Sequence, residues 1–546
     1  MTAPDVAAAG GPLTESLFGA DTSRPVLDLS VGELLRQAAA DLPERPVLIS
    51  IAVDRDPRTW TYAQLLDDAE HAAAWLLQRF RPGDHIAVWA PNVPEWVVLQ
   101  YGVALAGMVL VTANPALRGG ELTYLLRRSR AAGVAYAESF RGTDMASLLG
   151  QVLAELPEPL VAVPFTGWLE QIRAASVDGV RLPAVDPSSA TQIQFTSGTT
   201  GFPKAAVLRH RAMVTNADHI RARGNWPEHA TWVSAMPLFH TGGCGMAGMS
   251  TLVQRGTLVL AETFDPGLTL QAVEQYRAEL FIGVPTMLKA LLADPGLNSY
   301  DLTSLQVIMS GGDTVPPELI EACERTFGVG FSTVYGQTEL SPILTQTSSD
   351  DTNEDNRHTA GRPLWNVDVA ILDATGNVVP VGSEGEICAR GYQKMMEYLD
   401  NPQETAATID ADGWLHTGDL GAMDSRGYLT VTGRLKDMII RGGENIYPRE
   451  IEGVLQQHPA VATAVVLGLQ DPDWGETVAA VVQLQPDTDS PTGAQLQEFL
   501  RARLAPHKTP RSWYTSDTLP TNATGKLQKF RLREQIQADE LPALDG

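Results

Sequence analysis

The sequence lacks an excess of positive charge. Its 546 residues include 40 lysines and arginines against 65 aspartates and glutamates, which gives a formal net charge of −25. Nucleic acids and anionic membranes bind basic protein faces, so this composition argues against both as main partners. An anionic small ligand remains compatible with the composition, because a glycine-rich loop and a few cations can hold a phosphate inside an acidic protein.

Cysteine is scarce. The three cysteines, Cys244, Cys323 and Cys388, are widely spaced, and none belongs to a CxxC pair. This pattern excludes a disulfide framework and a cysteine-rich zinc motif, and it favours free thiols in a reducing compartment. We therefore expect a cytoplasmic protein.

Long hydrophobic runs are also missing. The longest apolar stretch, residues 97–113, is interrupted by Gln100, Gly102 and Gly107, and it is short for a membrane span. It predicts a buried helix that runs into a buried strand. The first residues contain Asp5 and no basic run, so no secretory leader is expected there.

Short apolar runs alternate with helical patterns over most of the chain. This alternation predicts right-handed βαβ units, hence an α/β fold with largely parallel sheets and helices on both faces. Strands are expected at residues 85–90, 108–113, 133–137, 191–195, 257–261, 278–284 and 305–312, and helices at 92–107 and 120–131.

The sequence pattern changes near residue 380. Turn-forming residues recur there every few positions, which predicts a small β-rich subdomain. A new set of patterns follows Gly433, with helices expected at 448–459 and 493–504 and strands at 462–469 and 477–485. At this length the chain should form at least two domains. We predict an N-terminal domain over residues 1–433, a hinge at 434–437 and a smaller, mobile α+β domain over 438–546.

The segment TSGTTGFPKAA, residues 196–206, contains a lysine, Lys204, close to two glycines. Lysine is rare in this chain, since only seven of the 40 basic residues are lysine, so this position suggests a specific need for an ammonium group. Glycines such as Gly198 and Gly201 allow successive backbone N–H groups to converge on an anion, and Lys204 adds a compact charge. The segment is not a Walker A loop, since Pro203 intervenes and no hydroxyl residue follows the lysine. Taken alone it is either a phosphate-binding loop or a mobile surface loop.

Further segments follow this loop in a characteristic order. They are YGQTE at 335–339, GWLHTGDL at 413–420, GRLKDMIIRGGENIYPREIE at 433–452 and LPTNATGKLQKFRLRE at 519–534, with PNVPEW at 91–96 and NPALRGGEL at 114–122 upstream. Together they resemble the acyl-adenylate-forming superfamily, and within it the acyl-CoA synthetases, over nearly the whole chain.

This resemblance implies a two-step reaction that uses ATP, Mg²⁺ and coenzyme A. A carboxylate attacks the α-phosphorus of MgATP, giving an acyl-AMP and pyrophosphate, and a thiolate then displaces AMP. The implied nucleotide-binding residues are Thr196, Ser197, Gly198, Thr199, Thr200, Gly201, Lys204, Gly311, Gly312, Asp313, Tyr335, Gly336, Asp419 and Arg434. Thr338 would donate to the α-phosphate, and Glu339 would bind the metal as a hard oxygen ligand.

The resemblance also assigns roles to the C-terminal domain. Lys526 would bridge the acyl carboxylate and the α-phosphate during adenylation. Lys436 matches the hinge about which the domain rotates between the two steps. Gly442, Gly443 and Glu444 would then border the tunnel for the pantetheine arm.

The acyl side of the site is assigned in the same way. His240 lies at the mouth of the implied acyl pocket, and Cys244, Val284 and Pro285 would line it. The glycines around Cys244 indicate either close backbone approach or room for a bulky apolar acid. We expect a hydrophobic carboxylic acid as substrate.

The sequence departs from the family pattern at Glu397, where glycine is usual, at Trp365–Asn366, where Pro–Gly is common, and at Thr521, where a basic residue often stands. None removes a catalytic group, but an enzyme specialised for one half-reaction stays open, with adenylation the more impaired. Activation of an acid for a carrier protein, a luciferase-like oxygenase and a non-catalytic nucleotide sensor stay open as well. An amino-acid substrate is disfavoured, and a homodimer is left open.

Overall fold

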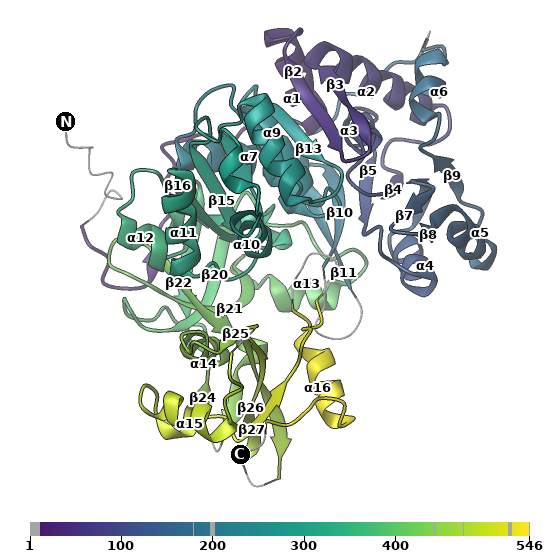
Figure 1. Cartoon of the computed structure of the whole chain (residues 1–546). Coiled ribbons are helices and arrows are strands. Elements are labelled where there is room, and N and C mark those ends of the chain that lie inside the picture. Colours follow the sequence, from purple (N-terminus) through teal and green to yellow (C-terminus); the bar gives the residue numbers. More distant parts are fainter. Residues whose placement is uncertain are drawn as a thin grey trace.

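The computed structural model describes residues 11–177, 179–196, 203–441, 444–472, 474–486, 488–521 and 527–544. Figure 1 shows a large part, drawn from purple to green, and a smaller C-terminal part below it. The predicted fold class is confirmed: mixed α/β, with parallel-rich sheets and a β-rich subdomain in the large part.

The largest sheet in the described chain has nine strands in the order β18-β17-β16-β15-β14-β12-β13-β2-β3. It is parallel from β16 to β2 and antiparallel at both ends. Apolar side chains are buried on both faces of the parallel strands, as their continuous hydrophobic runs require. The strands are β2 Pro46–Ala52, β3 Arg55–Thr61, β12 Thr231–Ser234, β13 Thr257–Ala261, β14 Leu280–Ile282, β15 Val307–Gly311, β16 Gly330–Gly336, β17 Ile343–Gln346 and β18 Arg362–Pro363.

A six-stranded sheet with the order β11-β10-β5-β4-β6-β9 lies beside it. All neighbours are parallel except β10 and β11, which form an antiparallel pair. The strands are β4 His85–Trp89, β5 Val109–Ala113, β6 Ala131–Tyr136, β9 Val161–Pro164, β10 Ala190–Thr196 and β11 Lys204–Arg209, with a separate hairpin of β7 Ser139–Phe140 and β8 Thr143–Asp144.

Helices cover both sheets, and the long apolar run is one of them. All of α3 except Glu95 is buried, and β5 after it is buried throughout, as predicted. At Gly102 a Cβ would lie 2.7 Å from the Cβ of Ala72, so glycine is what lets α3 pack closely on α2. The helices are α1 Val31–Asp41, α2 Tyr62–Leu77, α3 Pro94–Leu105, α4 Gly119–Arg128, α5 Met145–Glu155, α6 Trp168–Ala174, α7 His210–Gly224, the π-helix η1 Gly242–Met249, α8 Ser250–Val253, α9 Pro266–Tyr276, α10 Pro285–Leu292, η2 Leu297–Ser299, α11 Pro317–Phe327, η3 Thr338–Leu340 and α12 Asn353–His358.

The β-rich subdomain is a five-stranded antiparallel sheet in the order β1-β19-β20-β21-β22. Its elements are β1 Leu17–Phe18, β19 Val367–Leu372, β20 Gly385–Gly391, β21 Leu415–Met423, β22 Leu429–Arg434 and the helix α13 Pro402–Thr408. Asn366, one of the expected departures from the family pattern, adopts φ +59° just before β19. Asparagine tolerates this left-handed backbone better than most residues, so the departure from the pattern keeps the turn.

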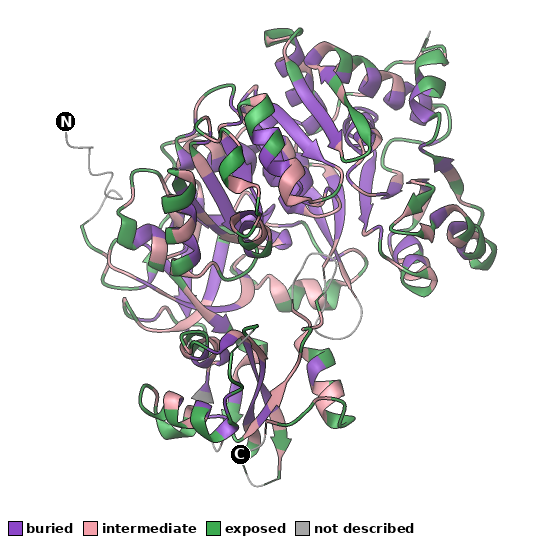
Figure 2. Ribbon diagram, in the orientation of Figure 1, coloured by how far each residue is buried: buried purple, intermediate pink, exposed green. Residues whose placement is uncertain are grey.

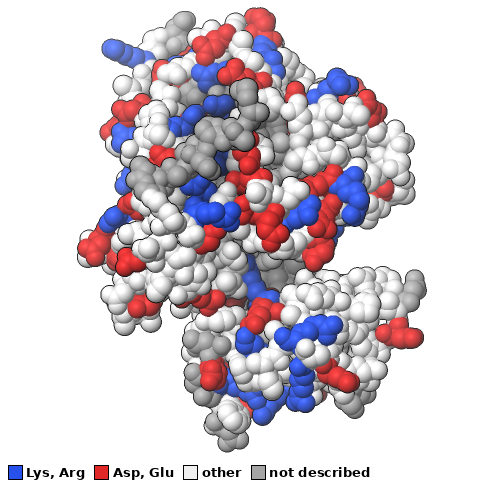
Figure 3. All heavy atoms as spheres, turned by 90° about the vertical axis from the view of Figure 1, so that its left-hand side faces the viewer, with Lys and Arg blue, Asp and Glu red and all other residues white. Residues whose placement is uncertain are grey.

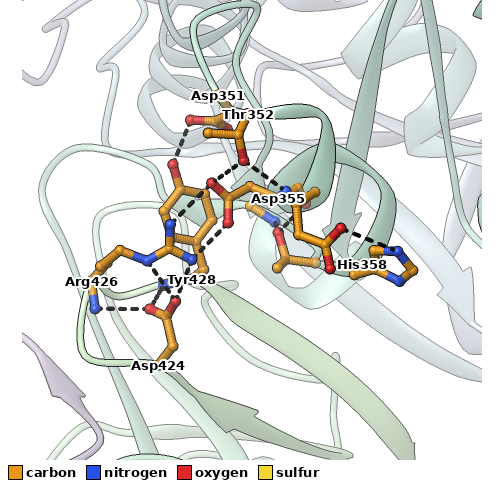
Figure 4. Close-up of polar contacts among 10 residues, drawn as sticks. Asp351, Thr352, Asp355, His358, Asp424, Arg426 and Tyr428 are labelled. Carbon is orange, nitrogen blue, oxygen red and sulfur yellow. Dashed lines mark hydrogen bonds and ion pairs between the residues drawn. The ribbon is translucent and has the colours of Figure 1, made fainter.

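The turn between β21 and β22 is anchored to α12 (Figure 4). Arg426 donates two hydrogen bonds to the buried carboxylate of Asp355, at 2.6 and 3.1 Å, and also pairs with Asp424. The Tyr428 hydroxyl donates to Asp351 at 2.5 Å. These contacts fix the β21–β22 hairpin against the large sheet, and they thereby position the opposite end of the hairpin, where Asp419 and Arg434 lie.

The C-terminal part has its own five-stranded sheet, in which β24, β23, β26 and β25 are antiparallel neighbours and β27 is parallel to β26. Alternate residues of β25 and β26 face α14 and α15 on one side and α16 on the other. This period of two gives the small part its own core, the buried strands of Figure 2. The elements are η4 Leu435–Asp437, β23 Ile439–Arg441, β24 Glu444–Ile446, α14 Pro448–Leu455, β25 Val461–Asp471, β26 Gly475–Leu484, α15 Gly493–Arg501, η5 Pro506–Lys508, β27 Ser512–Thr515 and α16 Lys529–Gln537.

Among the helices of the described residues, none is both long and apolar enough to cross a membrane. Figure 3 shows acidic and basic side chains interspersed over one face of both parts, which meet there at a narrow waist.

Candidate active site

Several of the predicted site residues that the structure describes lie at the carboxyl ends of the parallel strands of the large sheet. Strand β12 has β13 on one side and β14 on the other, because the chain reverses its direction of advance across the sheet there. In open α/β sheets, ligands bind at the carboxyl edge next to such a reversal. His240 follows β12 and Val284 follows β14, so both lie at this edge, as the sequence predicts for the acyl side.

Two neighbouring strands bring the predicted adenine-binding residues together. Gly311 ends β15 and Tyr335 is near the end of β16, and Gly311 is paired with Val334 in the parallel ladder. A Cβ on Gly311 would lie 2.3 Å from the Val334 carbonyl oxygen, so only glycine fits there. Gly312 then adopts φ +78°, which turns the chain out of the sheet toward the exposed Asp313.

Tyr335, Asp419 and Arg434 form one hydrogen-bonded group. The Tyr335 hydroxyl donates to Oδ2 of Asp419 at 3.0 Å, and Nε of Arg434 donates to Oδ1 of the same carboxylate at 2.9 Å. Asp419 and Arg434 face each other across β21 and β22. Burial, and next the Asp419 charge, raise the pKa of Tyr335 well above its ordinary value, so the phenol keeps its proton and donates.

Thr338 and Glu339 lie in the short helix η3 directly after β16, and both are buried. Oε1 of Glu339 accepts a hydrogen bond from the Tyr398 hydroxyl at 2.7 Å. Among the described residues, the other carboxylate oxygen of Glu339 has no hydrogen-bond partner. Glu339 is therefore not a solvated surface acid, and one of its oxygens is available to a cation.

Gly336, between Tyr335 and η3, allows a close backbone approach. A Cβ there would lie 2.1 Å from the carbonyl oxygen of Pro342. The backbone N–H of Met395 donates to the Glu339 carbonyl at 2.8 Å, which ties η3 to the segment that carries Tyr398.

Lys204 opens β11, and Thr196 closes β10 directly opposite it. The Lys204 ammonium forms an ion pair with Glu404 of α13 and lies 5.0 Å from the centre of the Tyr398 ring. The hydrogen bond from Lys204 lowers the pKa of Glu404, and the charge of Lys436, the predicted hinge residue, adds to the effect. Tyr398 and Glu404 were not predicted from the sequence, although both lie in the segment between the predicted motifs.

The acyl side combines apolar and polar groups. Cys244 is fully buried in the π-helix η1, and Nε2 of Gln194 and of Gln192 lie 3.4 and 3.7 Å from its Sγ. Burial raises the pKa of the Cys244 thiol to about 12, so it is a neutral packing group rather than a nucleophile. At Gly243 a Cβ would lie 2.2 Å from the Pro237 carbonyl oxygen, which shows that this glycine provides close backbone approach.

Several predicted residues lie outside the described part of the chain. These are Ser197, Gly198, Thr199, Thr200 and Gly201 of the loop, Gly442 and Gly443 of the predicted tunnel, and Lys526. The described residues next to them form backbone pairs. Arg441 and the exposed Glu444 are opposite each other in the antiparallel ladder of β23 and β24, and Thr521 forms an isolated β-bridge with Leu527. Lys436 lies in η4 between the two parts and is exposed.

The other departures from the family pattern lie beside these elements. The Glu397 side chain is exposed, and its carbonyl oxygen accepts a hydrogen bond from the N–H of Val207 on β11 at 2.9 Å. Thr521 is exposed as well. Neither side chain enters the group formed by Tyr335, Asp419 and Arg434.

Tyr398 contacts both Lys204 and Glu339, and Tyr335 and Arg434 hydrogen-bond to Asp419, a grouping of the predicted phosphate, metal and ribose residues that suits an AMP-forming acid–thiol ligase. Comparison with known proteins agrees. The sequence profile described as "AMP-binding enzyme" matches residues 35–399, and that described as "AMP-binding enzyme C-terminal domain" matches residues 450–526. The chain belongs to the AMP-binding enzyme family.

Individual relatives align over almost the whole chain. The acyl-CoA synthetase YngI of Bacillus subtilis (strain 168) is 36% identical over 93% of this chain and 97% of its own length. The mitochondrial medium-chain acyl-CoA ligase ACSF2 of Rattus norvegicus is 33% identical over 94% of this chain and 89% of its own. The crystal structure of ATP-bound MatB from Rhodopseudomonas palustris has a TM-score of 0.83 and 28% identity, covering 94% of this chain and all of MatB.

Proposed function

We propose that this enzyme joins a hydrophobic carboxylic acid to coenzyme A through an acyl-AMP intermediate. The observation that carries the proposal is the convergence of Tyr335, Asp419 and Arg434 with Glu339 at the carboxyl edge of the large sheet. The names of YngI and ACSF2, an acyl-CoA synthetase and a medium-chain acyl-CoA ligase, support the same reaction.

In the first step the enzyme positions two anions against each other. A carboxylate oxygen of the acid attacks the α-phosphorus of ATP, and the bond to the bridging oxygen of the β-phosphate breaks to release pyrophosphate. Asp419 accepts hydrogen bonds from the ribose hydroxyls, and the Tyr335 ring packs on the adenine. Lys204 pairs with the outgoing phosphates, Thr338 donates to the α-phosphate, and Lys526 bridges the two reacting groups as charge develops.

A magnesium ion bound with ATP would be held by Glu339. Its carboxylate is a hard oxygen ligand of the kind that Mg²⁺ prefers, and one oxygen is open to such a ligand within the described structure. When bound, the ion would neutralise phosphate charge. Tyr398 holds the other oxygen and so orients the carboxylate toward the site.

In the second step the coenzyme A thiolate attacks the acyl carbonyl carbon, and AMP leaves. The C-terminal domain, residues 438–546, rotates about residues 434–437 between the steps, so that Gly443 replaces Lys526 at the site. His240 separates the acyl carboxylate from the incoming thiol. Cys244, Val284 and Pro285 line the acyl pocket, and these side chains suit a hydrophobic acid.

The proposal includes a cytoplasmic location. The three cysteines are free and buried in the described structure, which suits a reducing compartment. Expression of the untagged chain in its own cells, followed by fractionation, tests this point.

The function is tested with a panel of short-, medium- and long-chain fatty acids and aryl acids. Purified enzyme, MgCl₂ and ATP are incubated with each acid, with and without coenzyme A, and pyrophosphate and thioester are measured separately. We expect acid-dependent pyrophosphate release and a thioester only with coenzyme A. Release of ADP, or no acid-dependent pyrophosphate with any acid, would overturn the proposal.

The acceptor is tested in the same assay. A carrier protein bearing a phosphopantetheine arm replaces coenzyme A, while the acid stays the same. Faster loading of the carrier than of coenzyme A would identify the enzyme as one that activates acids for a carrier protein.

A further inference from the structure

A cluster of metal-binding side chains lies in the β-rich subdomain, apart from the predicted Glu339 site. It consists of Glu386 and Cys388 on β20 and His416 on β21, and their ligand atoms all lie within 4.8 Å of one another. Cys388 and His416 are direct neighbours across the two antiparallel strands, and Glu386 lies two residues before Cys388 on the same strand. The sheet itself therefore gathers the three groups on one face.

The distances within the cluster suit three ligands of one ion. Nδ1 of His416 lies 3.4 Å from Sγ of Cys388 and 2.8 Å from Oε2 of Glu386. With Zn–S near 2.3 Å and Zn–N and Zn–O near 2.0–2.2 Å, tetrahedral ligand atoms lie about 3.3–3.6 Å apart. All three ligand atoms lie within 4.8 Å of one another, and the Glu386 side chain would have to shift to open its 2.8 Å contact with His416 to this spacing.

The groups behind the ligands are arranged as in known metal sites. Oδ2 of Asp410 lies 3.4 Å from Nε2 of His416, and Oδ1 of Asp410 is held by the backbone N–H of Trp414 at 2.8 Å. A carboxylate on the second ring nitrogen fixes the orientation of a metal-binding histidine. Oε1 of Glu386 accepts a hydrogen bond from the backbone N–H of Gly418 at 3.0 Å, so Oε2 is the oxygen that faces the His416 imidazole.

We propose that Glu386, Cys388 and His416 bind one borderline-soft divalent cation, with Zn²⁺ as the fitting ion. A thiolate and an imidazole select Zn²⁺ over Mg²⁺ and Ca²⁺, which take oxygen ligands. Cys388 is fully buried, but about a quarter of the His416 side chain and a fifth of the Glu386 side chain are exposed, so an ion and a fourth, water ligand can enter from solvent.

The bound ion would stabilise the part of β21 that leads to Asp419, and it would take no part in the reaction itself. His416 lies three residues before Asp419 on β21, and Glu386 holds the strand segment between them through the N–H of Gly418. A cation bound to both Glu386 and His416 would stiffen this segment. We expect Zn²⁺ to raise the thermal midpoint of the protein, because a ligand that binds only the folded state stabilises it.

The test uses tag-free, chelator-dialysed protein and Co²⁺ as the spectroscopic probe, followed by competition with Zn²⁺. We expect one Co²⁺ per chain with a thiolate-to-cobalt charge-transfer band in the near ultraviolet, displaced by Zn²⁺ and unaffected by excess Mg²⁺. The variants Cys388→Ser and His416→Gln should lose the band. Asp410→Asn should keep it and weaken affinity by about tenfold or more.

Two matched variants control for general effects of the substitutions. Cys323→Ser removes another buried thiol, and His358→Gln removes an imidazole that lies 3.8 Å from a carboxylate, Glu354, without a thiol beside it. Both should keep the band and the affinity. X-ray absorption of the wild-type Zn²⁺ complex, which needs no variant, should show one sulfur ligand. Absence of the band in the wild type, a zinc shell without sulfur, or an unchanged band in folded Cys388→Ser would each overturn the site.

Discussion

The two parts of the chain that meet at residues 434–437 hold their predicted functional residues in different ways. In the large part, Asp419 and Glu339 are buried, and a tyrosine hydroxyl hydrogen-bonds to each of them. In the small part, the one described residue of the predicted tunnel, Glu444, is exposed. The two predicted nucleotide-site carboxylates are therefore already held by neighbouring side chains, whereas the predicted tunnel residue lies at the surface of the small part.

The fixed positions of Asp419 and Glu339 suit the nucleotide site proposed for the large part. Ordered donors and acceptors that need no rearrangement during the reaction lower its barrier most effectively. The anchoring of the β21–β22 turn on α12 supplies this order at Asp419 (Figure 4). Under the proposed function the small domain takes part in two different steps, so it could not be fixed in the same way to one of them.

The largest expected effect tests the small part in the first step. Lys526→Ala should slow acyl-AMP formation by about 10²–10³, since one charge-stabilising donor is lost. Thioester formation from supplied acyl-AMP should stay near the parent rate. Lys508→Ala, which removes an exposed ion pair with Glu450 in the same domain, is the control and should leave both rates unchanged. Acyl-AMP formation at the parent rate in Lys526→Ala would contradict the assignment.

The second prediction tests the small part in the second step. Gly443→Leu should still release pyrophosphate and accumulate acyl-AMP, but it should slow thioester formation by about 10², because a side chain would displace the pantetheine arm. The thermal midpoint is measured alongside to show that the variant folds. A folded variant that makes thioester at the parent rate would place the tunnel elsewhere.

The third prediction concerns the large part. Asp419→Asn should raise the KM for ATP by about 10- to 100-fold, the value of a hydrogen bond to a charged group. Because this site serves the nucleotide in both steps, use of supplied acyl-AMP should weaken as well. Asp412→Asn, at an exposed position just before β21, is the control, and an Asp419→Asn enzyme with an unchanged KM would refute the ribose role.

The fourth prediction concerns the metal ligand. Glu339→Gln should raise the Mg²⁺ concentration needed for half-maximal pyrophosphate release by about tenfold or more, since an amide is a poorer ligand for a hard cation. Glu354→Gln, an exposed glutamate on α12, provides the matched control. Equal magnesium dependence in wild type and Glu339→Gln would exclude the magnesium role.

The smallest expected effect concerns the ion pair between Lys204, the predicted phosphate-binding residue of the large part, and Glu404. Glu404→Gln removes an anionic partner that competes with the phosphates of ATP for Lys204, so it should lower the KM for ATP by about 2- to 5-fold, as befits a partly exposed ion pair. A raised KM would instead show that Glu404 holds Lys204 in its productive position.

Local pattern determined much of the fold. The strands at His85–Trp89 and Thr257–Ala261 and the helix at Pro94–Leu105 lie where apolar runs and turn signals predict them. These elements follow from the sequence because their periodicity and caps are properties of neighbouring residues. The boundary of the β-rich subdomain was predicted less sharply, because its short antiparallel strands depend on partners far along the chain.

The order of the motifs by itself determined the family and the reaction, since the residues predicted to bind phosphate, metal and ribose stand in recognisable local segments. Only the tertiary structure decided their partners. Tyr398 is 59 residues from Glu339, and Glu404 is 200 residues from Lys204, yet each pair is in contact. Cross-strand pairing likewise decided that Cys388 faces His416. Contacts of this kind depend on sheet register and on which strands become neighbours, and neither is encoded within one local segment.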